Sequence, residues 1–134
     1  MSPSQLQVAI VGLGRMGSRH AIHFHHFTPR ARLVAACSPE PNELEWASEN
    51  LDGVRLYSDY DRMLEQEETV QAIVVASATA VHAEQAIKAI SKGLHVLCEK
   101  PLSTNLELVR EKLAFLSRKW RLKLTVSSLV TSCC

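Results

Sequence analysis

Short apolar runs of strand length alternate with longer segments of helical character along almost the whole chain. Strands are predicted over residues 7–11, 32–37, 54–57, 71–76, 94–98 and 122–126. Helices are predicted over residues 16–27, 42–50, 79–92 and 104–119 and in the segment after Ser58, with Ser58 and Thr104 as helix caps. The run at 71–76 is apolar on both faces, which is typical of a parallel sheet covered by helices on both sides. The pattern therefore predicts an α/β fold with a doubly wound parallel sheet.

Length and composition narrow the class of protein. A chain of 134 residues supports one domain, and 46% hydrophobic residues is ordinary for a globular protein. A formal net charge of +1 indicates no basic surface for nucleic acid. The apolar runs are too short to span a bilayer, and the first residues lack the basic and apolar blocks of a secretory signal. We expect a cytoplasmic protein with no membrane or nucleic-acid partner.

Neither the cysteines nor the histidines form a recognisable metal set. The four cysteines, at positions 37, 98, 133 and 134, have the spacing of neither a zinc site nor a disulfide framework. Four histidines lie between His20 and His26, but no carboxylate or cysteine completes a ligand set among them. We therefore expect no metal site and a reducing environment.

A glycine-rich turn follows the first predicted strand and opens the first predicted helix. Its G-x-G-x-x-G pattern comprises Gly12, Leu13, Gly14, Arg15, Met16 and Gly17. In such a turn the first glycine allows the tight bend, the second lets the backbone approach a pyrophosphate, and the third lets the helix pack closely on the strand. The free N–H groups of the helix N-terminus then face the phosphates. A purely structural turn can have the same pattern, but its place between a strand and a helix favours a Rossmann-type nucleotide site.

The choice between NAD and NADP depends on the residue that ends the second predicted strand. An NAD site usually has Asp or Glu there, bonded to the ribose 2′-OH. This chain has Ser38, which carries no charge to repel a 2′-phosphate and is able to donate a hydrogen bond to it. No Arg or Lys follows closely, since Glu40 comes next, and Arg15 offers a phosphate contact only from the glycine turn. The sequence leans slightly to NADP and leaves NAD open.

Two later segments carry a family resemblance. They are residues 75–83, which read VASATAVHA, and residues 93–103, which read GLHVLCEKPLS. Together with the glycine turn and His20, they resemble the GFO/IDH/MocA oxidoreductases, which include inositol dehydrogenases, glucose–fructose oxidoreductase and dihydrodiol dehydrogenases. The resemblance runs from Val8 to Val126. It implies a nicotinamide cofactor and hydride transfer to or from a polyol, sugar or related alcohol.

The resemblance also implies roles for individual residues. Lys100 is similar to the family's active-site lysine, which holds the substrate hydroxyl and assists proton movement. A lysine after a parallel strand lies in the crevice where ligands bind to such sheets, and its ammonium stabilises negative charge developing on an alcohol oxygen. Glu99 and Pro101 resemble the cofactor-side and shaping positions beside it. The loop expected to lie along the cofactor contains Ser77, Thr79 and His82, of which His82 is a candidate to bond a ribose or phosphate.

The chain departs from the family after the sixth predicted strand. We expect a dinucleotide-binding domain over residues 1–126, an atypical tail over 127–134, and no C-terminal substrate domain. The isolated chain is then expected to bind dinucleotide weakly, to turn over little, and to self-associate through apolar surface left uncovered. An alcohol substrate is expected only if a substrate domain is supplied. The alternative is a catalytically silent nucleotide-binding or regulatory fragment.

Overall fold

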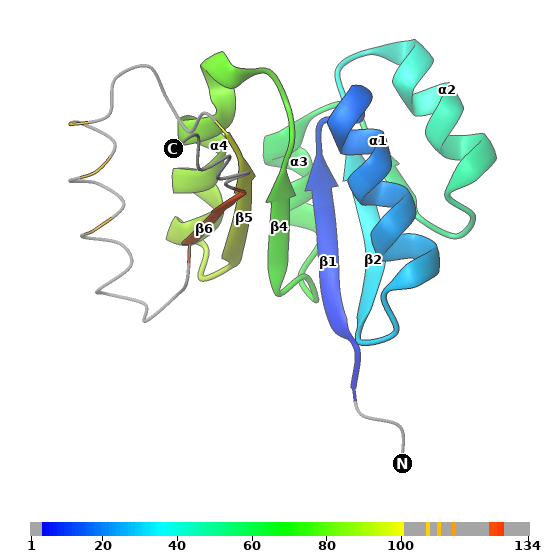
Figure 1. Ribbon diagram of the computed structural model, residues 1–134, viewed down its shortest axis with the longest axis horizontal. Coiled ribbons are helices and arrows are strands. Elements are labelled where there is room, and N and C mark those ends of the chain that lie inside the picture. Colours follow the sequence, from blue (N-terminus) through cyan, green and yellow to red (C-terminus); the bar gives the residue numbers. More distant parts are fainter. Residues whose placement is uncertain (1–3, 101–106, 108–109, 111–113, 115–123, 128–134) are drawn as a thin grey trace, which may run out of the picture.

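The fold is built on one parallel sheet (Figure 1). The computed structural model describes residues 4–100, 107, 110, 114 and 124–127. The strands are β1 (Leu6–Val11), β2 (Ala31–Cys37), β3 (Arg55–Tyr57), β4 (Ala72–Val75), β5 (His95–Glu99) and β6 (Leu124–Ser127). They are ordered β3-β2-β1-β4-β5-β6, and every neighbouring pair is parallel. This order is that of the doubly wound dinucleotide-binding fold, so the fold class predicted from the sequence is confirmed.

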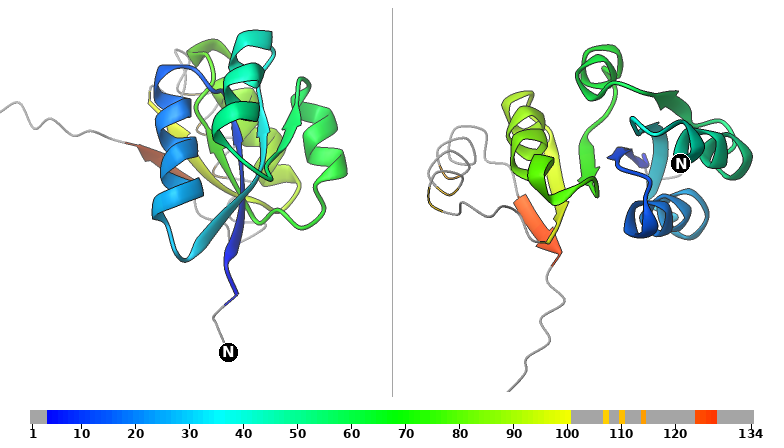
Figure 2. Two further views of the ribbon diagram at one scale, coloured as in Figure 1. Left: turned by 90° about the vertical axis from the view of Figure 1, so that its right-hand side faces the viewer. Right: turned by 90° about the horizontal axis from the view of Figure 1, so that it is seen from above.

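The helices cover both faces of the sheet. Those with described bounds are α1 (Arg15–Ile22), its π-helical continuation η1 (His23–Phe27), α2 (Pro41–Asn50), α3 (Tyr60–Gln66) and α4 (Thr79–Ser91). Viewed from above, α1 lies on one side of the sheet and α3 and α4 lie on the other (Figure 2, right). This arrangement leaves the strand ends, rather than the sheet faces, open to a ligand.

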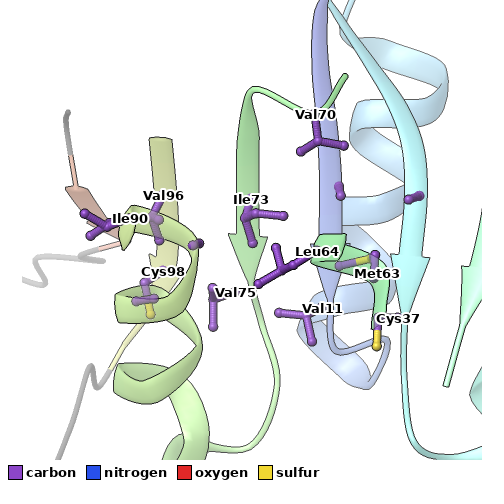
Figure 3. Packing of buried hydrophobic residues seen from close by; sticks show 14 of the residues in the cluster. Val11, Cys37, Met63, Leu64, Val70, Ile73, Val75, Ile90, Val96 and Cys98 are labelled. Atoms are coloured by element: carbon purple, nitrogen blue, oxygen red, sulfur yellow. The ribbon is translucent and has the colours of Figure 1, made fainter. Parts of the chain in front are cut away.

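Two apolar cores lie on the two faces of the sheet, and the strands belong to both. In β1, Val8 and Ile10 enter one core, whereas Ala9 and Val11 enter the other. This alternation explains why the strand reads as apolar at every position from Val8 to Val11. The helices close the first core with Ala21 and Ala47, and the second with Met63, Ala86 and Ile90 (Figure 3).

Two sequence expectations about helix starts have different outcomes. Asp59, not Ser58, caps α3, because the helix begins one residue later than expected and the Asp59 carboxylate accepts a 2.8 Å hydrogen bond from the Arg62 N–H. The prediction of Ser58 as cap was therefore wrong.

The predicted helix over 104–119 and its cap Thr104 lie outside the described residues, apart from isolated positions within it. The expected tail over 127–134 also lies outside them, except Ser127, which belongs to β6.

Candidate functional site

The predicted site residues gather at the carboxyl edge of the sheet. Gly12 follows β1, Ser38 follows β2, Ser77 lies in the loop after β4, and Lys100 follows β5. The chain turns from β1 outward to β2 and β3, and then returns to β4 on the other side of β1. Ligands of open α/β sheets bind outside the strand ends at such a reversal. The topology therefore brings together, at one edge, residues that are far apart in the sequence.

The first and third glycines of the turn are required by the packing of the protein itself. Gly12 has a φ of +92°, and a Cβ on it would lie 2.4 Å from the backbone nitrogen of Ser77. A Cβ on Gly17 would lie 1.9 Å from the carbonyl oxygen of Gly12. Real Cβ atoms do not approach other atoms so closely, so any side chain at either position would force the backbone to move. These two glycines hold the β1 turn against α1 and the loop after β4.

Gly14 is different, because no backbone of the protein crowds it. A Cβ there would meet only Glu43 Oε1, at 3.5 Å, which is an ordinary van der Waals contact. Its backbone, with φ −68° and ψ −158°, is extended and suits other residues. The fold alone therefore does not require glycine at this position. Gly14 is the second glycine of the G-x-G-x-x-G pattern, the position at which such turns let a pyrophosphate approach the backbone.

The rest of the turn divides into buried and exposed residues. Leu13 is buried in the core, whereas Arg15 and Met16 are exposed at the start of α1. No side chain caps this helix at Gly14. The N–H groups in the first turn of a helix have no partner within the helix, so α1 presents hydrogen-bond donors and a partial positive charge at the open edge.

Ser38 does not present its hydroxyl to the open edge. The side chain is fully buried, and Oγ donates a hydrogen bond to Oε2 of Glu43. The same oxygen accepts a 3.1 Å hydrogen bond from the Glu40 N–H. The hydroxyl proton that the sequence analysis assigned to a 2′-phosphate is therefore already donated within the protein.

The loop after β4 is held by contacts with its own helix. Ser77 Oγ donates to the side-chain oxygen of Gln85, and the Nε2 atom of His82 lies 2.5 Å from the Ser77 carbonyl oxygen. His82 is only 2% exposed, so its ring contacts the loop backbone from inside the protein. Thr79 is the first residue of α4 and is half-buried. These contacts fix the course of the loop against the glycine turn.

A cavity of about 240 Å³ opens beside this loop on the β2 side. Its walls come from the ends of β1 and β2 and from the starts of α3 and α4; they include Val11, Cys37, Pro39, Ser58, Val81 and Gln85. Burial raises the pKa of the Cys37 thiol to about 12, and it does the same for Cys98 at the end of β5. Both thiols are therefore protonated at neutral pH, so neither is a nucleophile or a thiolate ligand.

The turn after β5 is joined to α1 by a side-chain contact between a histidine and a glutamate. His20 Nε2 contacts Glu99 Oε1, and the two side chains are 25% and 13% exposed. Lys100 follows directly and is exposed at the bend after the strand. Pro101, predicted to shape this turn, lies outside the described residues. The pair fixes the backbone that leads into Lys100 relative to the helix that opens at the glycine turn.

Three features of the site were missed by the sequence analysis: the carboxylate of Glu43, the Ser77–Gln85 bond and the His20–Glu99 pairing. Each of these is a side-chain contact that depends on the tertiary fold.

In the described part of the chain, no group of three or more His, Cys, Asp and Glu side chains is arranged to hold a metal ion. No helix that the structure describes is long and apolar enough to cross a membrane.

Comparison with known proteins agrees with the geometry of this edge. Residues 6–127 match the GFO/IDH/MocA family model, described as an oxidoreductase family with an NAD-binding Rossmann fold. Inositol 2-dehydrogenase 4 of Saccharopolyspora erythraea is 37% identical over 103 residues, which is 77% of this chain and 30% of that protein. The scyllo-inositol 2-dehydrogenase (NAD(+)) of Bacillus subtilis is 30% identical, with the same shares covered.

Solved structures give the same result. The scyllo-inositol dehydrogenase from Lactobacillus casei, crystallised with NAD(H) and scyllo-inositol, aligns with a TM-score of 0.84 at 32% identity. The alignment covers 92% of this chain and 36% of that one. The chain thus spans about 30% of the length of the curated relatives it matches. It belongs to the GFO/IDH/MocA oxidoreductases, and residues 6–127 match their NAD-binding Rossmann fold.

Proposed function

We propose that this chain binds a nicotinamide dinucleotide across the carboxyl edge of the sheet and serves as the cofactor module of an oxidoreductase. The proposal is carried by the open space beside Gly14. The packing of the protein does not require a glycine at this position, because a Cβ there would make only an ordinary contact. A pyrophosphate approaching the uncapped N-terminus of α1 would use that space and the free N–H groups there. The substrate class we propose is a polyol, sugar or related alcohol, by analogy with the inositol dehydrogenases.

The two halves of the cofactor would lie on opposite sides of the glycine turn. In dinucleotide-binding folds the adenosine ribose lies beside the end of the second strand. The cavity on that side has apolar walls at Pro39 and Val81, which would face the flat ring of a purine. Its polar lining includes Gln85 and charged side chains, among them Asp59, Asp61, Glu84 and Lys88. The nicotinamide would then lie toward β5.

The loop that contains Ser77 and Thr79 would run along the cofactor. We propose that His82 holds this loop through its contact with the loop backbone and makes no direct bond to a ribose or phosphate.

Lys100 is our candidate for the catalytic residue, since it lies beside the expected place of the nicotinamide. When bound, a nicotinamide would supply the hydride acceptor for an alcohol C–H bond. The Lys100 ammonium would stabilise negative charge developing on the alcohol oxygen. The Glu99–His20 pair would hold the turn that directs this lysine, and Pro101 keeps its predicted shaping role.

The substrate would be bound by a region that corresponds to the unmatched part of the curated relatives. The curated relatives are about three times as long as the part matched here. Hydride transfer requires a substrate held against the cofactor in a water-poor site. One exposed lysine at an open edge does not provide this. We therefore propose that residues 1–126 bind the cofactor and that turnover requires a substrate domain.

Calorimetric titration of the purified chain with NAD and with NADP tests the proposal. We expect saturable binding of a dinucleotide and no reduction of it when inositol is added. Nicotinamide mononucleotide, which lacks the adenosine half, serves as the control ligand and is expected to bind far more weakly. A folded chain that binds neither dinucleotide would overturn the proposed function. Robust inositol oxidation by the chain alone would overturn the need for a substrate domain.

A further inference from the structure

We propose that Glu43 reads the adenosine ribose and selects NAD over NADP, a role for which the sequence analysis considered only Ser38. The inference rests on the proposed function, because it assumes that a dinucleotide binds at this edge. It concerns one carboxylate on α2, where the strand-end position that usually carries the acid has a serine.

Glu43 lies between the glycine turn and the end of β2. It lies in the first turn of α2 and is half-buried. Its Oε2 atom accepts the hydrogen bond from Ser38 at the end of β2. Its Oε1 atom lies 3.5 Å from the place that a Cβ on Gly14 would take. The carboxylate therefore spans the gap between the glycine turn and the end of β2, where the adenosine ribose lies in folds of this kind.

The chemistry of Ser38 and Glu43 favours NAD over NADP. Ser38 has donated its only proton to Glu43, and its oxygen accepts the Glu40 N–H, so it offers a phosphate no donor. A carboxylate accepts hydrogen bonds from ribose hydroxyls, so it favours NAD. A 2′-phosphate carries a charge of about −1.5 to −2 at neutral pH, and a carboxylate beside it is repulsive. The same carboxylate also repels a pyrophosphate at Gly14, but NAD and NADP share that group, so this repulsion does not change the ratio of their affinities. The slight lean to NADP rested on the missing negative charge at Ser38 and on its free hydroxyl. The Glu43 carboxylate supplies a charge there and the hydroxyl is not free, so this geometry removes both reasons.

Glu43→Gln is the informative variant. Glutamine has nearly the same shape and still accepts the Ser38 hydrogen bond, so the fold is expected to persist while the charge is lost. Glu45→Gln is the matched control, because Glu45 is exposed on the same helix and its loss changes the net charge equally. Thermal unfolding of all three proteins confirms that the comparison is made between folded chains.

The measurement is the ratio of the Kd for NADP to the Kd for NAD, obtained by calorimetry for the original chain and both variants. We expect the original chain and Glu45→Gln to favour NAD by about tenfold or more, and Glu43→Gln to lower the ratio by about tenfold. A ratio that Glu43→Gln leaves unchanged while NAD still binds would overturn the role of Glu43 alone, as would an original chain that favours NADP. If the original chain and Glu45→Gln bind neither dinucleotide, the proposed function itself fails, and this inference with it.

Discussion

Replacing Gly14 with alanine separates what the glycine turn does for folding from what it does for a ligand. The new Cβ would meet only Glu43 Oε1, at 3.5 Å, on a backbone that alanine adopts readily. Losing a glycine lowers the entropy of the unfolded chain and stabilises by about 0.4–1 kcal/mol. Alanine is a poorer N-cap than glycine, which offsets a similar amount. We expect the free energy of unfolding to change by less than about 1 kcal/mol.

Dinucleotide binding is expected to weaken, although the stability of the fold stays nearly unchanged. The added methyl group occupies the space through which a pyrophosphate would approach the backbone at the start of α1. We expect Gly14→Ala to weaken NAD binding at least about tenfold, which is about 1.4 kcal/mol. The assays are urea denaturation followed by circular dichroism for stability, and calorimetric titration with NAD for binding.

Gly17→Ala is the contrasting variant. Its Cβ would lie 1.9 Å from the Gly12 carbonyl oxygen, so the backbone of the turn must shift. Overpacking of this kind costs about 1–3 kcal/mol or more. We expect Gly17→Ala to lose stability, and we expect Gly14→Ala to lose NAD binding while its stability stays intact. This explanation of the two glycines is refuted if Gly14→Ala destabilises the chain as strongly as Gly17→Ala does, or if Gly14→Ala keeps full affinity for NAD.

Two further predictions concern buried ionisable groups. The Glu67 carboxylate accepts hydrogen bonds of 2.6 Å from Arg55 and from Tyr57, and the Arg55 bonds hold its pKa below the usual value. Its stabilisation is present above the unfolded pKa of about 4.3 and is lost as pH falls through the lower folded pKa. Glu67→Gln is expected to cost about 1–3 kcal/mol at pH 7, with the difference shrinking in acid; an equal difference in urea denaturation at pH 7 and pH 3 would contradict this. Burial raises the pKa of the Cys37 and Cys98 thiols to about 12, so the folded chain holds these protons more tightly than the unfolded chain does. The folding free energy gained with both thiols protonated is therefore lost as pH rises from the unfolded thiol pKa of about 8.5 toward 12. Mass spectrometry of alkylated peptides is expected to show slow labelling of both thiols in the folded chain at pH 8, and labelling as fast as in urea would disprove their burial.

The fold was largely predictable because its signals are local. The glycine turn is contiguous, and the strand predicted over 71–76 corresponds to β4 (Ala72–Val75), which is buried on both faces. Apolar residues on both faces of a short run are expected from a parallel sheet covered by helices. The start of α3 was missed by one residue, because Ser58 and Asp59 are both competent caps and only the tertiary course of the chain selects Asp59.

The site was predictable as a set of positions but not as a set of contacts. Parallel strands bring their carboxyl ends to one edge, so the presence of Ser38 and Lys100 there follows from the strand pattern. The contact between His20 and Glu99 joins residues 79 positions apart, and nothing in the local sequence of either specifies the other. The bond from Ser38 to Glu43 depends on how α2 leaves β2, which is a matter of loop geometry.

The central claim is that a nicotinamide dinucleotide binds at the glycine turn. Amide resonances of the ¹⁵N-labelled chain during titration with NAD test it most directly, because the chain has only five glycines. Gly12, Gly14 and Gly17 lie at the carboxyl edge, whereas Gly53 and Gly93 precede β3 and β5 at the opposite edge and serve as internal controls. The account predicts saturable shifts of the three turn glycines with the two control glycines unmoved. Shifts confined to Gly53 and Gly93, or none at any glycine of a folded chain, would contradict it.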